Sequence, residues 1–229
     1  MGKRTGRIGF AAVLVLGGLA GPLHGQAEAY PERPRPLPEA EEIALARTAA
    51  PAEVSDHAAI YVLRAGGPAK VIEGSNGCTC MVSRDLHRGS RYPICFDQEA
   101  TRTLFPRELM ELRLRFEGRS EPAVKRQVAA AYAEGTLPHP ARPAVVYMMS
   151  SRQVLFSSPE PDGRRIGAWH PHLMIALPNA TGAQLGFGED GSAGDFTLDH
   201  PGEPSAQLIV PVTWWADSAP AGVRQESGR

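Results

Sequence analysis

The sequence predicts an α+β domain with a mainly antiparallel sheet, an inserted pair of helices and an N-terminal helix. Residues 58–96 and 144–212 consist of short apolar runs separated by Gly, Pro and other turn residues, a texture typical of strands. Between them, residues 104–135 place apolar side chains at helical spacing. Strands, then helices, then further strands form the pattern of an α+β fold. The 42% hydrophobic content excludes a disordered chain, and 21 Pro with 24 Gly exclude a simple helical bundle.

Residues 1–29 predict a signal peptide in front of this domain. Lys3, Arg4 and Arg7 precede an apolar run over residues 8–20, and Ala27-Glu28-Ala29 offers the small residues that a signal peptidase reads. The apolar run is well short of the roughly 20 residues that span a bilayer. We therefore expect a soluble mature protein that is secreted or periplasmic and carries no transmembrane anchor.

The mature chain is expected to form one domain over residues 39–216. Residues 30–38 contain four prolines and predict an extended, solvated segment before it. The polar residues 217–229 predict a flexible tail. Lys plus Arg number 24 against 25 Asp plus Glu, a balance that argues against a nucleic-acid-binding protein.

Three helices are predicted. Residues 39–50 are rich in Ala, Glu and Leu, with acidic residues in the first turn and Pro51 after the end. Residues 104–118 carry an apolar stripe and end at a glycine. Ser120 can cap the next helix, because its hydroxyl can accept a hydrogen bond from a free N–H of the first turn, and Gly135 is a natural stop. The last two helices are expected to pack as an antiparallel pair.

Strands are predicted on both sides of this pair. Residues 58–64 and 69–73 flank Gly66-Gly67-Pro68 and predict a hairpin, which residues 78–83 extend into a three-stranded meander. Further strands are expected at residues 92–96, 144–150, 153–157, 172–177 and 206–212. The acidic, glycine-rich residues 189–195 predict a solvated connection.

The chain contains three cysteines. Cys78 and Cys80 are too close in sequence to bond to one another without strain, so Cys95 is the expected partner of one of them. In an oxidising compartment, a disulfide between Cys80 and Cys95 would contribute on the order of 3 kcal/mol. We favour this pair because both residues have apolar, strand-like surroundings, although Cys78 with Cys95 fits nearly as well. The remaining thiol is an inert buried group, a site of intermolecular pairing or a nucleophile.

The most distinctive segment is Trp169-His170-Pro171-His172, which Met174 follows shortly after. Pro171 favours extended backbone before it, so His170, His172 and Met174 should project to one side. Imidazole and thioether groups are ligands for copper or zinc, but the other histidines show no spacing that nominates a third ligand. The alternatives are that the two histidines line a cleft or bond to backbone, or that one is a general base beside a cysteine.

Four segments, residues 59–64, 143–156, 169–177 and 208–212, together resemble a group of exported bacterial proteins that contain a Trp-His-Pro-His segment. The resemblance covers most of the mature chain. It implies an exported bacterial location, and it brings with it no assigned activity, cofactor or catalytic residue.

Three functions are compatible with these patterns. The preferred hypothesis is a module that binds a small ligand or a metal ion in a cleft near His170 and His172. The second is a hydrolase or transferase that uses Cys80 or Cys78 with His172. The third is a structural or interaction protein of the cell envelope. The sequence has no glycine-rich phosphate loop, no nucleophile-elbow serine and no His-Glu-x-x-His, which removes several common enzyme classes.

Overall fold

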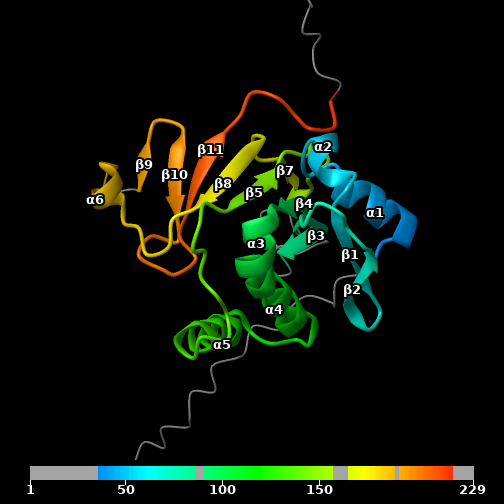
Figure 1. Cartoon of the computed structure of the whole chain (residues 1–229), viewed down its shortest axis with the longest axis horizontal. Helices are drawn as coiled ribbons and strands as arrows, with labels where there is room; N and C mark the ends of the chain where they lie inside the picture. The colour runs from blue at the N-terminus through cyan, green and yellow to red at the C-terminus, as the bar shows by residue number, and fades with distance from the viewer. Residues whose placement is uncertain (1–35, 86–89, 157–164, 189–190, 219–229) are drawn as a thin grey trace, which may run out of the picture.

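The computed structural model describes residues 36–85, 90–156, 165–188 and 191–218 (Figure 1). The predicted signal peptide, most of the proline-rich segment and most of the predicted tail lie outside these ranges. The described residues form the helices α1 (Glu39–Arg47), α2 (Ala52–Ser55), α3 (Gln98–Thr103), α4 (Phe105–Phe116), α5 (Glu121–Ala133) and α6 (Gly182–Leu185). None of these helices has the length and apolar character needed to cross a membrane.

Most of the strands belong to one large sheet. The described strands are β1 (Ala59–Arg64), β2 (Gly67–Ile72), β3 (Thr79–Asp85), β4 (Ser90–Phe96), β5 (Val145–Met148), β6 (Leu155–Phe156), β7 (Arg165–Gly167), β8 (His172–Ala176), β9 (Ser192–Ala193), β10 (Phe196–Asp199) and β11 (Gln207–Pro211). Nine of them form a sheet in the order β2-β1-β3-β4-β5-β8-β11-β10-β9, and β6 pairs with β7. All neighbours in the large sheet are antiparallel except β1 and β3. An α+β fold with a mainly antiparallel sheet is therefore confirmed.

The predicted three-stranded meander is wrong. β1 and β2 form the expected hairpin, but β3 pairs with the other edge of β1 and runs parallel to it. The connection from β2 to β3 crosses the start of β1, where the Ala59 N–H donates to the Cys78 carbonyl at 2.9 Å. Gly74 permits this crossing, because a Cβ at this position would overlap the backbone of Ala59. Local sequence predicts a hairpin well. Which edge of the hairpin the next strand pairs with depends on contacts made across the sheet.

Alternation along the strands gives the sheet two apolar faces. On the α1 face, strand residues pack against α1 and the turn after it: Ile60, Val62, Cys80, Val82 and Cys95 against Leu45, Ala46 and Ala49. On the α4 face, strand residues pack against α3 and α4: Met81, Ile94, Phe96, Val146, Met148 and Met174 against Ala100, Leu104, Phe105 and Leu112. Helices α1 and α4 both lie over the half of the sheet that contains β1–β4 (Figure 1). No described helix makes comparable contact with β8, β10 or β11.

A buried ion pair joins α1 to the sheet. The Glu42 and Arg84 side chains are each 1% exposed, and Arg84 Nη2 lies 2.8 Å from Glu42 Oε2. The other carboxylate oxygen of Glu42 accepts a hydrogen bond from the Leu63 N–H at 2.7 Å. One carboxylate on α1 therefore binds both β1 and β3.

The helices differ in detail from the prediction. The expected N-terminal helix over residues 39–50 corresponds to α1, which ends at Arg47 and is followed by the short α2. Helix α3 was not predicted; it begins at an Asp97 cap whose side chain accepts from the Ala100 N–H at 2.7 Å. Helices α4 and α5 contact each other, while their antiparallel orientation stays a prediction. Part of the region predicted as a solvated connection forms β9, which pairs with β10.

Candidate ligand-binding groove

A groove of about 1510 Å³ lies on the α4 face, between the sheet and helices α4 and α5. Strands β4, β5, β8 and β11 supply its floor, and the two helices supply a wall. In Figure 1, α5 is set apart from the strands and lies below them in the view. The volume exceeds the roughly 300–1,000 Å³ of most small-molecule sites.

The floor of the groove is apolar because four strands place a large apolar side chain in the same row. Phe96 pairs in register with Val146, Val146 with Met174, and Met174 with Ile209. All four line the groove. The period-two alternation of the strands thus gives one continuous apolar strip across β4, β5, β8 and β11.

The predicted histidine segment forms one end of the groove. His170, His172 and Met174 all line it, together with Trp169. His172 is 6% exposed, and its Nδ1 lies 2.6 Å from the His170 carbonyl oxygen. Burial lowers the pKa of His172, and this hydrogen bond offsets the shift in part. Trp169 packs edge-on against Tyr92, with ring centroids 5.4 Å apart, and is 45% exposed.

Metal binding by the histidine segment stays a prediction. His170, His172 and Met174 line the same groove, and the His172 Nδ1 lies against the His170 carbonyl oxygen. The described residues contain no group of three or more His, Cys, Asp or Glu side chains that could hold a metal ion.

Helix α4 lines the groove with a row of charges. Arg107, Glu111 and Arg115 stand at i, i+4 spacing, with Arg107–Glu111 at 3.4 Å and Arg115–Glu111 at 3.1 Å. Arg115 also pairs with Glu121 of α5 at 2.9 Å, which links the two helices. Burial raises the pKa of Glu111, and Arg107 opposes this effect. This row was not predicted from the sequence, although its i, i+4 spacing is a local signal.

The end of the groove opposite Trp169 is polar. Asp199, His200, Ser205 and Gln207 line it from β10, β11 and the turn between them, and Tyr132 lines it from α5. His200 lies 3.4 Å from the carboxylate oxygens of Asp199 and of Glu203. Three buried polar atoms of the groove residues have no hydrogen-bond partner among the described residues: Gln207 Oε1, Tyr132 Oη and Arg107 Nε.

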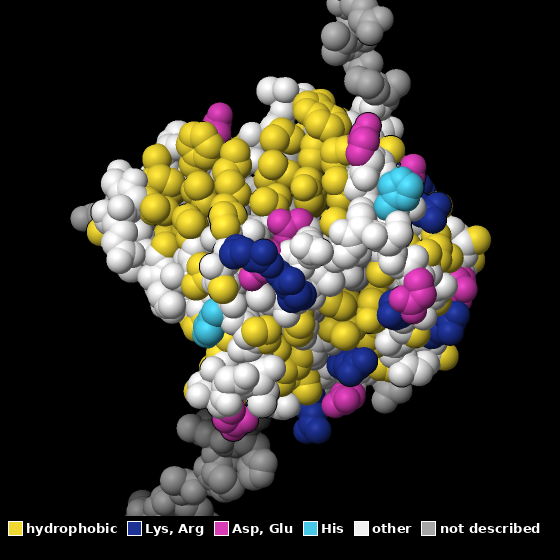
Figure 2. Space-filling model, viewed as in Figure 1, with side chains coloured by type: hydrophobic (Ala, Val, Ile, Leu, Met, Phe, Trp, Pro, Cys, Tyr) yellow, Lys and Arg dark blue, Asp and Glu magenta, His cyan; other side chains and the backbone are white. Residues whose placement is uncertain are grey.

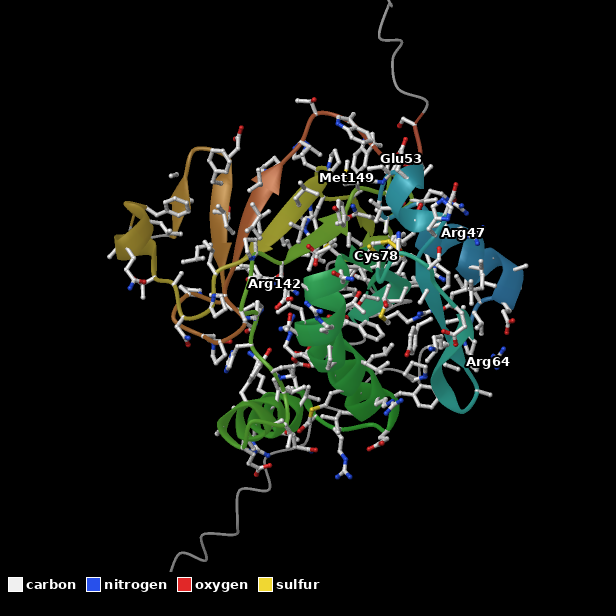
Figure 3. All side chains as sticks on the ribbon, in the orientation of Figure 1. Arg47, Glu53, Arg64, Cys78, Arg142 and Met149 are labelled. Carbon is white, nitrogen blue, oxygen red and sulfur yellow. A yellow bond between two sulfur atoms is a disulfide. The ribbon has the colours of Figure 1, made fainter. Side chains whose placement is uncertain are left out.

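The cysteines lie away from this groove. Cys80 and Cys95 face each other on β3 and β4 and form a disulfide on the α1 face. Cys78, labelled in Figure 3, is the free cysteine and is half-buried. Burial and the nearby Asp97 carboxylate raise the pKa of its thiol. The structure thus places Cys80, the weak catalytic candidate, in a disulfide across the sheet from His172.

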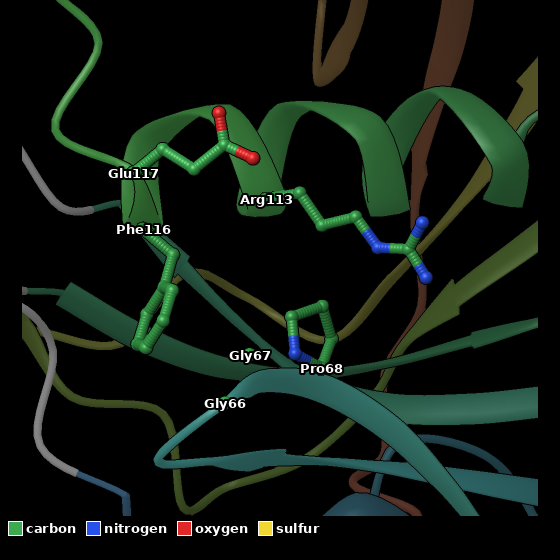
Figure 4. A pocket seen from close by; sticks show the side chains of 6 residues that line it. All are labelled: Gly66, Gly67, Pro68, Arg113, Phe116 and Glu117. Carbon is green, nitrogen blue, oxygen red and sulfur yellow. The ribbon is translucent and has the colours of Figure 1, made fainter.

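A second hollow is smaller and lies between the β1–β2 turn and the C-terminal end of α4 (Figure 4). Its volume is about 340 Å³, and Gly66, Gly67, Pro68, Arg113, Phe116 and Glu117 line it. Arg113 and Glu117 are exposed to solvent. This hollow therefore offers a ligand little burial.

The half of the sheet without a helix also exposes apolar side chains. Figure 2 shows hydrophobic side chains gathered over β8, β10 and β11. On the face opposite the groove, Leu173, Ile175, Leu208 and Val210 alternate with the groove residues and are half-buried. Any apolar probe of the groove must therefore be distinguished from binding to this second face.

No family model, curated protein or solved structure matches this chain.

Proposed function

We propose that this chain is an exported bacterial protein that binds a small, mainly apolar ligand in the groove. The observation that carries the proposal is the apolar strip of Phe96, Val146, Met174 and Ile209, which lines the groove beneath a wall of charged side chains. Apolar side chains that line a hollow with a few polar groups at its ends are typical of ligand sites.

The cysteines support binding over thiol catalysis. A nucleophilic cysteine requires a thiolate, which a lowered pKa favours. The pKa of the free Cys78 is raised, and Cys80 is bonded to Cys95. The same disulfide supports export, because disulfides persist in oxidising compartments.

The test is the binding of the uncharged dye N-phenylnaphthylamine, whose fluorescence rises in apolar surroundings. Ile209 and Val210 are neighbours on β11, both half-buried and on opposite faces. We expect Ile209→Asn to weaken dye binding about tenfold, since about 1.4 kcal/mol corresponds to tenfold and full burial of such a side chain is worth about 1.5–3 kcal/mol.

Val210→Asn is the matched control and should leave the affinity unchanged. An equal loss in both variants would show that the dye does not prefer the groove, and a loss in Val210→Asn only would place the dye on the opposite face. Either result would refute the proposal. So would the absence of dye binding to the unaltered chain.

A further inference from the structure

We propose that the ligand is an uncharged amphiphile, with a hydrogen-bonding head beside Gln207 and Tyr132 and an apolar chain that extends along the floor toward Trp169. This inference rests on the proposed function, because it assigns a ligand class to the same groove.

The groove changes from polar to apolar along β11. Gln207, Ile209 and Pro211 line it in turn, and Asp199 of β10 lies in register with Gln207. Four residue steps from Gln207 to Pro211 span about 13 Å. An extended chain of roughly ten carbons covers that length, given carbon–carbon bonds of about 1.5 Å. One ligand can therefore have its head at the polar end and its chain against the apolar strip.

Within the described part of the chain, the polar end contains a buried acceptor without a donor and a buried donor without an acceptor. Gln207 is 4% exposed and its Oε1 needs a donor, whereas Arg107 Nε needs an acceptor and the Tyr132 hydroxyl can act as either. Arg107 interacts electrostatically with both Tyr132 and Asp199, and all three residues line the groove. Each buried polar atom without a partner costs about 1–3 kcal/mol. Small rotations of these side chains toward a bound head would recover part of that cost.

A head that carries a hydroxyl group satisfies this set, while charged heads satisfy only part of it. A hydroxyl can both donate and accept, so a head with hydroxyl groups offers a partner of each kind to Gln207 Oε1 and Arg107 Nε. A carboxylate has no donor for Gln207, and an ammonium group has no acceptor for Arg107. The match in hydrogen bonding therefore selects an uncharged head.

The charges of the groove also disfavour an anionic head. Five anionic side chains line it against three cationic ones: Glu108, Glu111, Glu121, Asp199 and Glu203 against Arg107, Arg115 and Lys125. Arg115 is already paired with Glu111 and Glu121. A carboxylate head would add negative charge to this surplus in a poorly solvated site, which is costly.

The experiment compares three probes whose chains each contain about twelve carbons: monolauroylglycerol, laurate and dodecyltrimethylammonium, each below its micelle concentration. The measurement is the concentration at which each displaces N-phenylnaphthylamine from the purified chain. We expect monolauroylglycerol to displace the dye at a concentration at least tenfold lower than either charged probe. Equal displacement by all three, preference for a charged probe, or displacement by none overturns this inference and leaves the proposed function standing. Failure of the dye itself to bind overturns the proposed function.

Two tyrosines provide a matched pair of variants. Tyr132 lines the groove, while Tyr147 packs on the α1 face, and both are half-buried. Tyr132→Phe should reduce the preference for monolauroylglycerol about fivefold, and Tyr147→Phe should leave it unchanged. Gln207→Leu removes the unpaired amide oxygen and should reduce the preference further. A preference that persists in Tyr132→Phe, or that falls equally in Tyr147→Phe, contradicts the inference, and circular dichroism verifies that each variant folds.

Discussion

Replacing Glu42 by Gln is expected to destabilise the fold strongly. The Glu42 and Arg84 side chains are each 1% exposed and lie 2.8 Å apart. Arginine does not lose its proton in proteins, so the substitution leaves a buried guanidinium charge without its counter-ion. The neutral amide retains an oxygen for the Leu63 N–H, which Glu42 Oε1 now accepts at 2.7 Å. The lost energy is therefore mainly that of the uncompensated charge.

Removing one partner of a buried ion pair costs about 3–5 kcal/mol. For a domain of this size, about 1 kcal/mol changes Tm by roughly 2–4 °C, so Tm should fall by roughly 6–20 °C. The control is Glu39→Gln on the same helix, because Glu39 pairs with Arg64 at 2.7 Å but both side chains are about half exposed. Such exposed pairs contribute about 0–1 kcal/mol.

The assay is urea and thermal unfolding followed by circular dichroism. The double variant Glu42→Gln with Arg84→Met removes the unpaired buried charge, so it should be more stable than Glu42→Gln alone. The reasoning fails if Glu42→Gln costs no more than Glu39→Gln. Arg84→Met is therefore measured alone as well. A stability loss in the double variant equal to the sum of the losses in Glu42→Gln and Arg84→Met would show that the two side chains are uncoupled.

Three further predictions test other parts of the structure. Gly74→Ala should cost about 1–3 kcal/mol in urea unfolding, because its Cβ meets the backbone of Ala59, whereas Gly66→Ala, with no atom within 4 Å, should be near neutral. Replacing Cys80 and Cys95 by Ala should cost about 3 kcal/mol for their separation of 15 residues, and Cys78→Ser should cost much less; equal losses would contradict the disulfide. Because burial lowers the pKa of His172, the unfolded chain takes up its proton first, so stability should be complete above about pH 6.5 and decline as pH falls below it. His172→Gln should weaken this decline, and an unchanged pH profile would refute the assignment.

Local patterns predicted the parts of the fold that depend on neighbouring residues. The hairpin of β1 and β2 follows from Gly66-Gly67-Pro68 between two apolar runs. The parallel pairing of β1 with β3 does not follow, because it arises from contacts across the sheet. Strand β9 was missed because it has two residues and is held by pairing with β10, in a stretch whose composition favours turns.

The candidate site likewise contains residues that local sequence patterns predict and residues that they do not. His170, His172 and Met174 were expected on one side, and all three line one groove. His172 and Met174 do so because side chains alternate along β8, whereas His170 lies before this strand. Gln207 and Tyr132 were not singled out, since their importance lies in buried atoms without partners. That property belongs to the packed structure and has no local signature in the sequence.

The groove exists because the sheet is wider than the helices that cover it. Nine strands spaced about 4.8 Å apart span roughly 38 Å, whereas a helix with its side chains is about 10 Å across. Among the described elements, α1 and α4 pack over the half that contains β1–β4, and α5 packs on α4 without comparable contact to a strand. Small residues on α5, including Ala129 and Ala133, line the space between α5 and the sheet. Larger side chains there would fill the groove and complete a core, so the open space depends on these small residues as well as on the width of the sheet.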